Sequence, residues 1–289
     1  MNDLDRSYDE CRRIARRHGT TYYWAAALLP RPRRRDVWAL YALARLADDI
    51  VDDLGERPVA ERAAALGALQ RRFFGDLAAG SSDHPVLGAV VHTVQTLGID
   101  PACFHEFFRS MTMDLTITNY ATWQDLLVYM NGSAAAIGEM MLPVLAPTTP
   151  AALQPARDLG LAFQLTNFLR DVGEDLDRDR IYVPLEDLER FGCDPTARRV
   201  DDRWRLLMRF EIERARQLYC SADRGLMMLP APSARCVRAA RTLYSQILHR
   251  IEAADYDVFT SRARVPTWRK LSTVGASIGT AAPWLAYRT

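Results

Sequence analysis

Apolar residues recur at helical spacing along most of the chain. They return every three or four positions, which places them on one face of a helix, whereas the alternation of apolar and polar residues that is typical of a strand is nearly absent. Glycines and prolines interrupt the pattern at the expected helix ends. The pattern predicts helices over residues 5–18, 21–29, 33–54, 58–79, 84–97, 100–118, 122–146, 149–178, 184–191, 199–228, 232–258 and 266–284.

The domain organisation follows from the same pattern. No stretch has the composition of a linker between domains, and no segment has low complexity. The 289 residues are enough for one large helical domain, and a content of 49% hydrophobic and 25% charged residues is ordinary for a protein with a sizeable core. We therefore predict an all-α fold in which residues 1–289 form a single domain.

Charge and cysteine content narrow the partners and the compartment. A formal net charge of +1 gives no broad positive field, so nucleic acid is not an expected partner. The five cysteines are odd in number and form no CxxC pair, which is typical of reduced thiols in a cytoplasm. The longest uncharged stretch near the end, residues 271–287, is diluted by Ser, Thr, Gly and Pro. We predict a cytoplasmic protein without a signal peptide or membrane span.

Two of the predicted helices each carry a stripe of polar residues in apolar surroundings. In the helix over residues 33–54, the stripe consists of Tyr41, Arg45, Asp48 and Asp52. In the helix over residues 149–178, it consists of Gln164, Asn167, Asp171 and Asp175. Steps of three and four residues place each set on one helix face, and each stripe ends in a DxxxD pair.

Two carboxylates four residues apart repel each other on a bare helix, so the two pairs call for an explanation. A divalent cation between them would turn the repulsion into attraction. Mg²⁺ prefers hard oxygen ligands and is usually held by one or two carboxylates together with water and substrate phosphate oxygens. A solvated helix face is the simpler interpretation of one such pair. Two pairs, each preceded by an amide, Arg or Tyr on its own face, favour a Mg²⁺–diphosphate site.

The segments around both stripes resemble the two signatures of the squalene/phytoene synthase family. They are VWALYALARLADDIVDD (37–53) and LAFQLTNFLRDVGEDLDRDRIYVPLEDL (161–188). Three further segments, at 18–30, 113–145 and 244–271, extend the resemblance over most of the chain. Within the family, the chain is most similar to bacterial phytoene synthases.

The resemblance implies a single-domain isoprenoid-synthase helical fold with a central apolar cavity. It implies Mg²⁺-dependent head-to-head (1′-1) condensation of two geranylgeranyl diphosphates to phytoene, through a cyclopropylcarbinyl diphosphate, in carotenoid biosynthesis. Mn²⁺ is an alternative metal, and no nicotinamide cofactor is expected. The expected partners are prenyl diphosphates, with peripheral contact to a membrane for product release.

The resemblance also assigns residues to roles. The metal ligands it implies are Asp48, Asp52, Asn167, Asp171 and Asp175. The substrate contacts it implies are His18, Thr21, Tyr41, Arg45, Tyr129, Gln164, Asn167, Arg170 and Tyr244. The residues expected to take part directly in catalysis are Asp48, Asp52, Asp171, Asp175, Arg45 and Tyr41.

The sequence departs from the family pattern at several positions, of which two bear on the site. Thr21 stands where the family usually has Ser, and Asn131 with residues 133–136 replaces the usual tyrosine and VAG run. The second change lies near the expected cavity, so it leaves alternatives open. One is a C30 synthase that uses farnesyl diphosphate, and another is a terpene cyclase that ionises a single prenyl diphosphate. A non-catalytic relative is a third, which the presence of both aspartate motifs disfavours.

Overall fold

The computed structural model describes residues 2–18, 20–52 and 57–260, with the backbone alone for residues 20–22. These residues are mostly helical, and their one extended pairing is an isolated parallel bridge between Asn119 and Ile181. This confirms the predicted all-α fold. The predicted helix over residues 266–284 lies outside the described residues.

Twelve α-helices make up most of the described chain. They are α1 (Asp3–His18), α2 (Thr20–Ala26), α3 (Arg31–Val51), α4 (Val59–Ala79), α5 (Leu87–Leu97), α6 (Pro101–Met113), α7 (Trp123–Met130), α8 (Ala136–Leu145), α9 (Leu153–Leu176), α10 (Leu185–Phe191), α11 (Asp202–Asp223) and α12 (Ala231–Ala253). The shorter helical turns are η1 (Asn131–Ala135), η2 (Pro150–Ala152), η3 (Pro195–Ala197) and η4 (Arg224–Met228).

Several helices begin or end at the capping residues, prolines and glycines that the sequence suggests. Asp100 caps α6, because its side chain accepts a hydrogen bond from the backbone N–H of Ala102 at 2.8 Å, and Pro101 occupies the first helical position. Gly80 ends α4 with a φ of 79°, a left-handed conformation that glycine adopts at little cost.

The predicted helix over residues 122–146 is helical over nearly its whole length, but it is not one regular α-helix. The helix begins as expected, with a capping box between Thr122 and Asp125, but the π-helical turn η1 separates α7 from α8. Gly132 lies in this turn, and a Cβ added there would lie 2.0 Å from the backbone oxygen of Glu106 on α6. The two backbones therefore approach more closely than any side chain allows, and the hydrophobic pattern does not record this contact.

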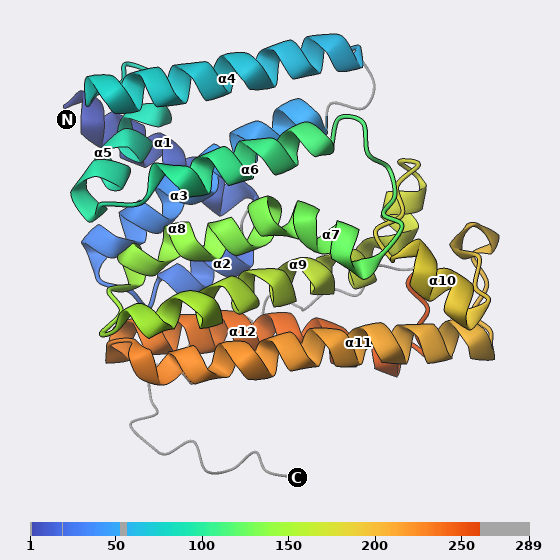
Figure 1. The fold of residues 1–289 in the computed structure, drawn as a ribbon. Helices are drawn as coiled ribbons and strands as arrows, with labels where there is room; N and C mark the ends of the chain where they lie inside the picture. The colour runs from blue at the N-terminus through green and yellow to red at the C-terminus, as the bar shows by residue number, and fades with distance from the viewer. Residues whose placement is uncertain (1, 19, 53–56, 261–289) are drawn as a thin grey trace.

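The described residues form two hydrophobic cores. In Figure 1, α9 runs between α8 and the pair of helices α11 and α12. The first core surrounds α3, which packs against α1, α4, α5 and α8, and the second core surrounds α9, which packs against α8, α11 and α12. The side chain of Phe163 on α9 contacts both cores. Within the described ranges, no helix combines the length and the apolarity needed to cross a bilayer.

Candidate active site

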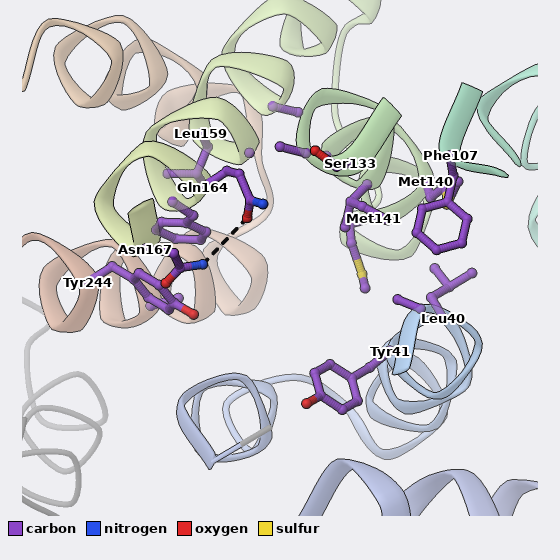
Figure 2. A pocket seen from close by; sticks show the side chains of 18 of the residues that line it. Leu40, Tyr41, Phe107, Ser133, Met140, Met141, Leu159, Gln164, Asn167 and Tyr244 are labelled. Atoms are coloured by element: carbon purple, nitrogen blue, oxygen red, sulfur yellow. Dashed lines mark hydrogen bonds between the residues drawn. The ribbon is translucent and has the colours of Figure 1, made fainter. Parts of the chain in front are cut away.

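A cavity of about 1020 Å³ lies between α3 and α9. This volume is at the upper end of the range usual for small-molecule sites, about 300–1,000 Å³. Figure 2 shows Tyr41 of α3 pointing into this space from the side opposite Asn167 and Tyr244, while Leu40 and Met141 lie beside it. The cavity is therefore bounded by the two helices that carry the polar stripes.

The two ends of the cavity differ in chemistry. The C-terminal parts of α3 and α9 contribute carboxylates, amides and arginines, whereas the N-terminal parts and α8 contribute apolar side chains, among them Val37, Leu40, Leu142, Leu145 and Leu159. Val37 and Asp52 are fifteen positions apart, so the lining extends roughly 22 Å along α3 at 1.5 Å per residue. The cavity thus combines a charged end with a long apolar chamber.

The stripe on α3 lines the cavity along its whole length. Burial and the neighbouring carboxylate of Asp52 raise the pKa of Asp48 to about 7. Arg45 forms an ion pair with Asp49, and its buried Nε lacks a hydrogen-bond partner. Burial raises the pKa of Tyr41 to about 12, so its hydroxyl keeps its proton at neutral pH. This stripe gathers negative charge that would be stabilised by a cation.

The stripe on α9 faces the same space. Arg170 clamps Asp171 through two hydrogen bonds, from Nε to Oδ1 at 2.7 Å and from Nη2 to Oδ2 at 2.6 Å. Burial and the carboxylate of Asp171 raise the pKa of Asp175 to about 7. The Nδ2 of Asn167 lies 3.5 Å from Oε1 of Gln164, whereas its buried Oδ1 has no hydrogen-bond partner (Figure 2).

The remaining predicted site residues lie outside the two stripes. His18 is exposed at the end of α1 and lines the cavity, as do Tyr129 of α7 and Tyr244 of α12, which are both buried. The side chain of Thr21 lies outside the described residues. The cavity therefore brings together every predicted site residue except Thr21, whose side chain is not placed.

Residues 15–269 match the sequence profile of squalene/phytoene synthase. The chain belongs to the squalene/phytoene synthase family. A 15-cis-phytoene synthase of Synechococcus elongatus is 38% identical over 289 residues, covering 95% of this chain and 93% of that protein. A chloroplastic phytoene synthase of Daucus carota is 38% identical over 279 residues, covering 93% of this chain and 69% of that protein.

Solved structures of this family have the same fold. A dehydrosqualene synthase in complex with a ligand superposes with a TM-score of 0.87 at 26% identity, covering 95% of this chain and 96% of the other. The squalene synthase HpnC of Alicyclobacillus acidocaldarius gives a TM-score of 0.79 at 27% identity, covering 89% and 99%. The predicted family and fold are thus confirmed.

Besides Ser133, four polar residues of this squalene/phytoene synthase cavity are absent from the predicted set of site residues. They are Asp114, Arg178, Arg180 and Tyr182. The last three follow the second aspartate motif directly, in the stretch DRDRIYVP that forms part of the family signature. From that stretch, Arg178, Arg180 and Tyr182 could have been predicted as site residues. The sequence does not show which other helix their side chains approach.

An aromatic wall joins these residues to Tyr129. The rings of Phe168 and Tyr182 stack with centroids 4.0 Å apart and planes 7° apart, and the ring of Tyr129 lies 5.9 Å from Tyr182. The hydroxyl of Tyr129 donates to Oδ2 of Asp114 at 2.8 Å. Burial raises the pKa of Asp114 to about 6, an effect that the nearby guanidinium of Arg180 opposes. The wall is both packed core and cavity lining.

The departures from the family pattern have unequal effects on the cavity. Asn131 is not part of the lining: its side chain donates to Oε2 of Glu106 at 2.8 Å and accepts from Nη2 of Arg157 at 2.5 Å. Ser133 and Ala134 do line the cavity, and the Oγ of Ser133 is buried without a hydrogen-bond partner. The altered run therefore changes the cavity wall at these two positions.

The oxygen donors suit a hard divalent cation. Among the described residues, no three His, Cys, Asp or Glu side chains already converge as a metal cluster. The buried amide oxygen of Asn167 nevertheless lacks a hydrogen bond, and the carboxyls of Asp48 and Asp175 are held at raised pKa values beside a second carboxyl. Such a set fits Mg²⁺, which keeps waters and takes its remaining ligands from phosphate oxygens.

Proposed function

We propose that this chain is a phytoene synthase that joins two molecules of geranylgeranyl diphosphate head to head (1′-1). The observation that carries this proposal is the placement of two aspartate motifs at the polar end of one long apolar cavity. The full-length similarity to phytoene synthases, at 35–38% identity, supports the same reaction.

The metal in this proposal is Mg²⁺, held by Asp48, Asp52, Asn167, Asp171 and Asp175. When bound, it neutralises the charge that builds on the departing diphosphate. Arg45 and Arg170 lie in the same part of the lining and are placed to donate hydrogen bonds to diphosphate oxygens. Gln164, His18 and Thr21 complete the polar contacts of the proposal.

The reaction takes place in two stages. Diphosphate leaves the first molecule, the double bond nearest the diphosphate of the second attacks the resulting allylic carbon, and loss of a proton gives the cyclopropylcarbinyl diphosphate. The second diphosphate then leaves, the ring rearranges to join the two C1 carbons, and loss of a second proton gives phytoene. Two carbon–oxygen bonds are broken, two diphosphates are released, and no reductant is consumed.

The chain contributes to these stages by excluding water and stabilising positive charge. The apolar chamber keeps the allylic cations away from water, which would quench them. Tyr41, Tyr129 and Tyr244 line the cavity, and their aromatic rings are suited to stabilise the cations as they move from the charged end. Because burial raises the pKa of Tyr41 to about 12, its hydroxyl keeps its proton at neutral pH. Tyr41 therefore contributes an aromatic ring and a hydrogen-bond donor.

The choice of a C20 substrate rests on the relatives. The matched relatives include phytoene synthases of a cyanobacterium and of a plant, whereas the superposed structures are C30 synthases at lower identity. The alternative is a C30 synthase with the same mechanism.

The proposal is tested by product analysis. Purified protein with Mg²⁺ is incubated with geranylgeranyl diphosphate alone or farnesyl diphosphate alone, without nicotinamide cofactor, and the extract is examined by gas chromatography–mass spectrometry. Phytoene from the C20 substrate is the expected result. A C30 product from the C15 substrate alone would refute the chain length, and a cyclic C20 hydrocarbon would make the protein a terpene cyclase.

We also propose that residues 1–289 form one domain that works in the cytoplasm against a membrane surface. All five cysteines are free, which suits a reducing compartment, and a C40 hydrocarbon has to leave the apolar chamber for a lipid phase. Sedimentation with phospholipid vesicles tests the membrane contact, and the absence of any co-sedimenting protein would remove it from the proposal.

A further inference from the structure

The segment after α9 brings two arginines from the second aspartate motif to the first. Its backbone is fixed, because the N–H of Arg180 donates to the backbone oxygen of Asp175 at 2.9 Å and the N–H of Ile181 donates to the backbone oxygen of Thr118 at 2.8 Å. Asp179, which lies between the two arginines Arg178 and Arg180, adopts a left-handed φ of 56°. The chain thus turns back over the C-terminal end of α3, where Asp52 lies.

Arg180 is a buried cation with a fixed side chain. Its Nη2 donates to the backbone oxygen of Asp114 at 3.0 Å, and its Nη1 donates to the hydroxyl of Tyr182 at 3.1 Å. The same Nη1 lies 3.6 Å from Oδ1 of Asp52 and 3.9 Å from Oδ1 of Asp114. Only 9% of the residue is exposed, so the charge is held in a low-dielectric region.

Arg178 approaches the other oxygen of the same carboxylate. Its Nη1 lies 3.8 Å from Oδ2 of Asp52, and its side chain is 43% exposed. Each oxygen of Asp52 therefore has one guanidinium within ion-pair distance, yet both separations exceed the length of an N–H···O hydrogen bond. Asp52 is electrostatically compensated, but its oxygens are not saturated by hydrogen bonds.

Two positive charges beside a metal ligand oppose the binding of a metal cation to that ligand. A Mg²⁺ ion that binds Asp52 without a phosphate group meets both guanidinium groups at short range. A diphosphate reverses this effect, because its oxygens accept hydrogen bonds from arginine and also complete the coordination of Mg²⁺. The two ligands then stabilise each other through the same pair of side chains.

We propose that Arg178 and Arg180 make Mg²⁺ binding at the first aspartate motif conditional on diphosphate. Both arginines oppose Mg²⁺ that binds beside Asp52 alone and can donate hydrogen bonds to a bound diphosphate, with Arg180 as the fixed cation and Arg178 as the adjustable one. The proposal rests on the proposed function, in that it takes Asp52 as a metal ligand. By linkage, diphosphate must raise the affinity for Mg²⁺ by the same factor as Mg²⁺ raises the affinity for diphosphate.

The test measures this coupling by isothermal titration calorimetry, with inorganic pyrophosphate as the probe. Mg²⁺ is titrated into the full-length protein with and without pyrophosphate, and the binding of Mg²⁺ to pyrophosphate in buffer is measured separately and subtracted. For the wild type, we expect pyrophosphate to raise the apparent Mg²⁺ affinity by about 100-fold, within the usual range of coupling between sites.

Removing the charges should uncouple the two ligands. In R178Q we expect Mg²⁺ to bind about fivefold more tightly without pyrophosphate and the coupling to fall about tenfold. R180K keeps the charge and should retain most of the coupling. Arg199 provides the matched control, because it is an arginine of a surface ion pair with Asp201 and its side chain is 77% exposed. R199Q should therefore titrate like the wild type.

The outcomes separate this proposal from the function on which it rests. If the wild type shows coupled binding and R178Q and the double variant R178Q/R180Q, with unchanged circular dichroism, show the same coupling, the role of the arginines is refuted while the metal site stands. If the wild type binds neither Mg²⁺ nor pyrophosphate, both proposals fail. Because Arg178 is exposed, R178Q keeps the test valid even where R180Q does not fold.

Discussion

The two aspartate motifs share a spacing but differ in how their charge is compensated. On α9, Asp171 is clamped by Arg170, its immediate neighbour in the sequence. On α3, Asp52 receives its cations from Arg178 and Arg180, which follow α9 and lie more than a hundred residues away in the sequence. Local compensation can be read in a sequence, whereas compensation by a distant segment depends on the fold.

This difference gives Asp52 a structural dependence that Asp171 lacks. The cations of Asp52 stay in place only while Asp114, Tyr182 and the backbone of Thr118 hold the returning segment. Asp171 keeps Arg170 beside it as long as α9 is intact, whereas Arg178 and Arg180 also act on Asp175 of the same motif. Substitutions at each motif test whether the two motifs are equally necessary and unequally supported.

The largest effect is expected from removing one carboxylate of either motif. Asp48→Ala and Asp171→Ala should each lower kcat by about 10²–10³-fold or more, the range found when one group that stabilises developing charge is removed. Because burial and Asp52 raise the pKa of Asp48 to about 7, the ionised carboxylate is unfavourable in the folded state, so the first variant should melt no earlier than the wild type. Phytoene formation and circular dichroism report the two properties.

A matched control for these variants is Asp177→Ala. Asp177 follows the second motif, but it is exposed, pairs with Arg198 and does not line the cavity. Its activity should stay within twofold of the wild type. Full activity in Asp48→Ala or Asp171→Ala would contradict the assignment of both stripes to the diphosphate site.

The next largest effect is a loss of stability when the contacts that hold Arg180 near Asp52 are removed. Asp114→Ala should destabilise the protein by about 2–4 kcal/mol, since the hydroxyls of Tyr129 and Tyr182 lose a buried acceptor and Arg180 loses a nearby negative charge. Urea unfolding followed by circular dichroism measures this change. Asp114→Asn keeps an acceptor and should recover part of the loss, and equal stability of the two variants would show that the hydrogen bonds contribute little.

A smaller effect is expected from pH. Burial and a neighbouring carboxylate raise the pKa values of Asp48 and Asp175 to about 7, so both motifs lose an ionised oxygen as the pH falls below 7. At limiting Mg²⁺, kcat/KM should fall about tenfold per pH unit for each required carboxylate below pH 7. Additional Mg²⁺ should move the midpoint to lower pH, because the metal competes with the proton.

The stability of the metal-free protein should change with pH in the opposite direction to the activity, which provides an independent check. Without Mg²⁺, the folded state retains protons that the unfolded state releases between about pH 4 and pH 7. The free energy of unfolding contributed by these two groups should therefore decrease as the pH rises through this range and level off above pH 7. A metal-free protein that gains stability from these groups between pH 5 and pH 7 would show that their pKa values are not raised.

The sequence predicts what is periodic and local, and misses what depends on close approach or return of the chain. The stripes were predictable because Asp48 and Asp52 occupy one helix face by spacing alone. The π-helical turn was not, because it depends on Gly132 meeting the backbone of α6. Arg180 lies within the family signature at residues 161–188, but its approach to Asp52 depends on the bridge between Asn119 and Ile181.

The smallest effect is expected in the cavity wall formed by η1, which carries neither aspartate motif. Ser133 places a buried hydroxyl without a hydrogen-bond partner in the cavity wall, in the run that departs from the family pattern. Burying a hydroxyl without a partner costs free energy, so Ser133→Ala should stabilise the protein by about 1 kcal/mol.

The activity of Ser133→Ala distinguishes two roles for that hydroxyl. If it is only an unsatisfied group in the wall, phytoene formation should stay within twofold of the wild type while the urea midpoint rises. Ala134→Ser adds a hydroxyl to the adjacent wall position and should do the reverse, lowering stability with little effect on the product. A change of product in Ser133→Ala, from phytoene to a shorter or cyclic hydrocarbon, would instead assign this serine to substrate folding, because the substitution leaves the charge at both aspartate motifs unchanged.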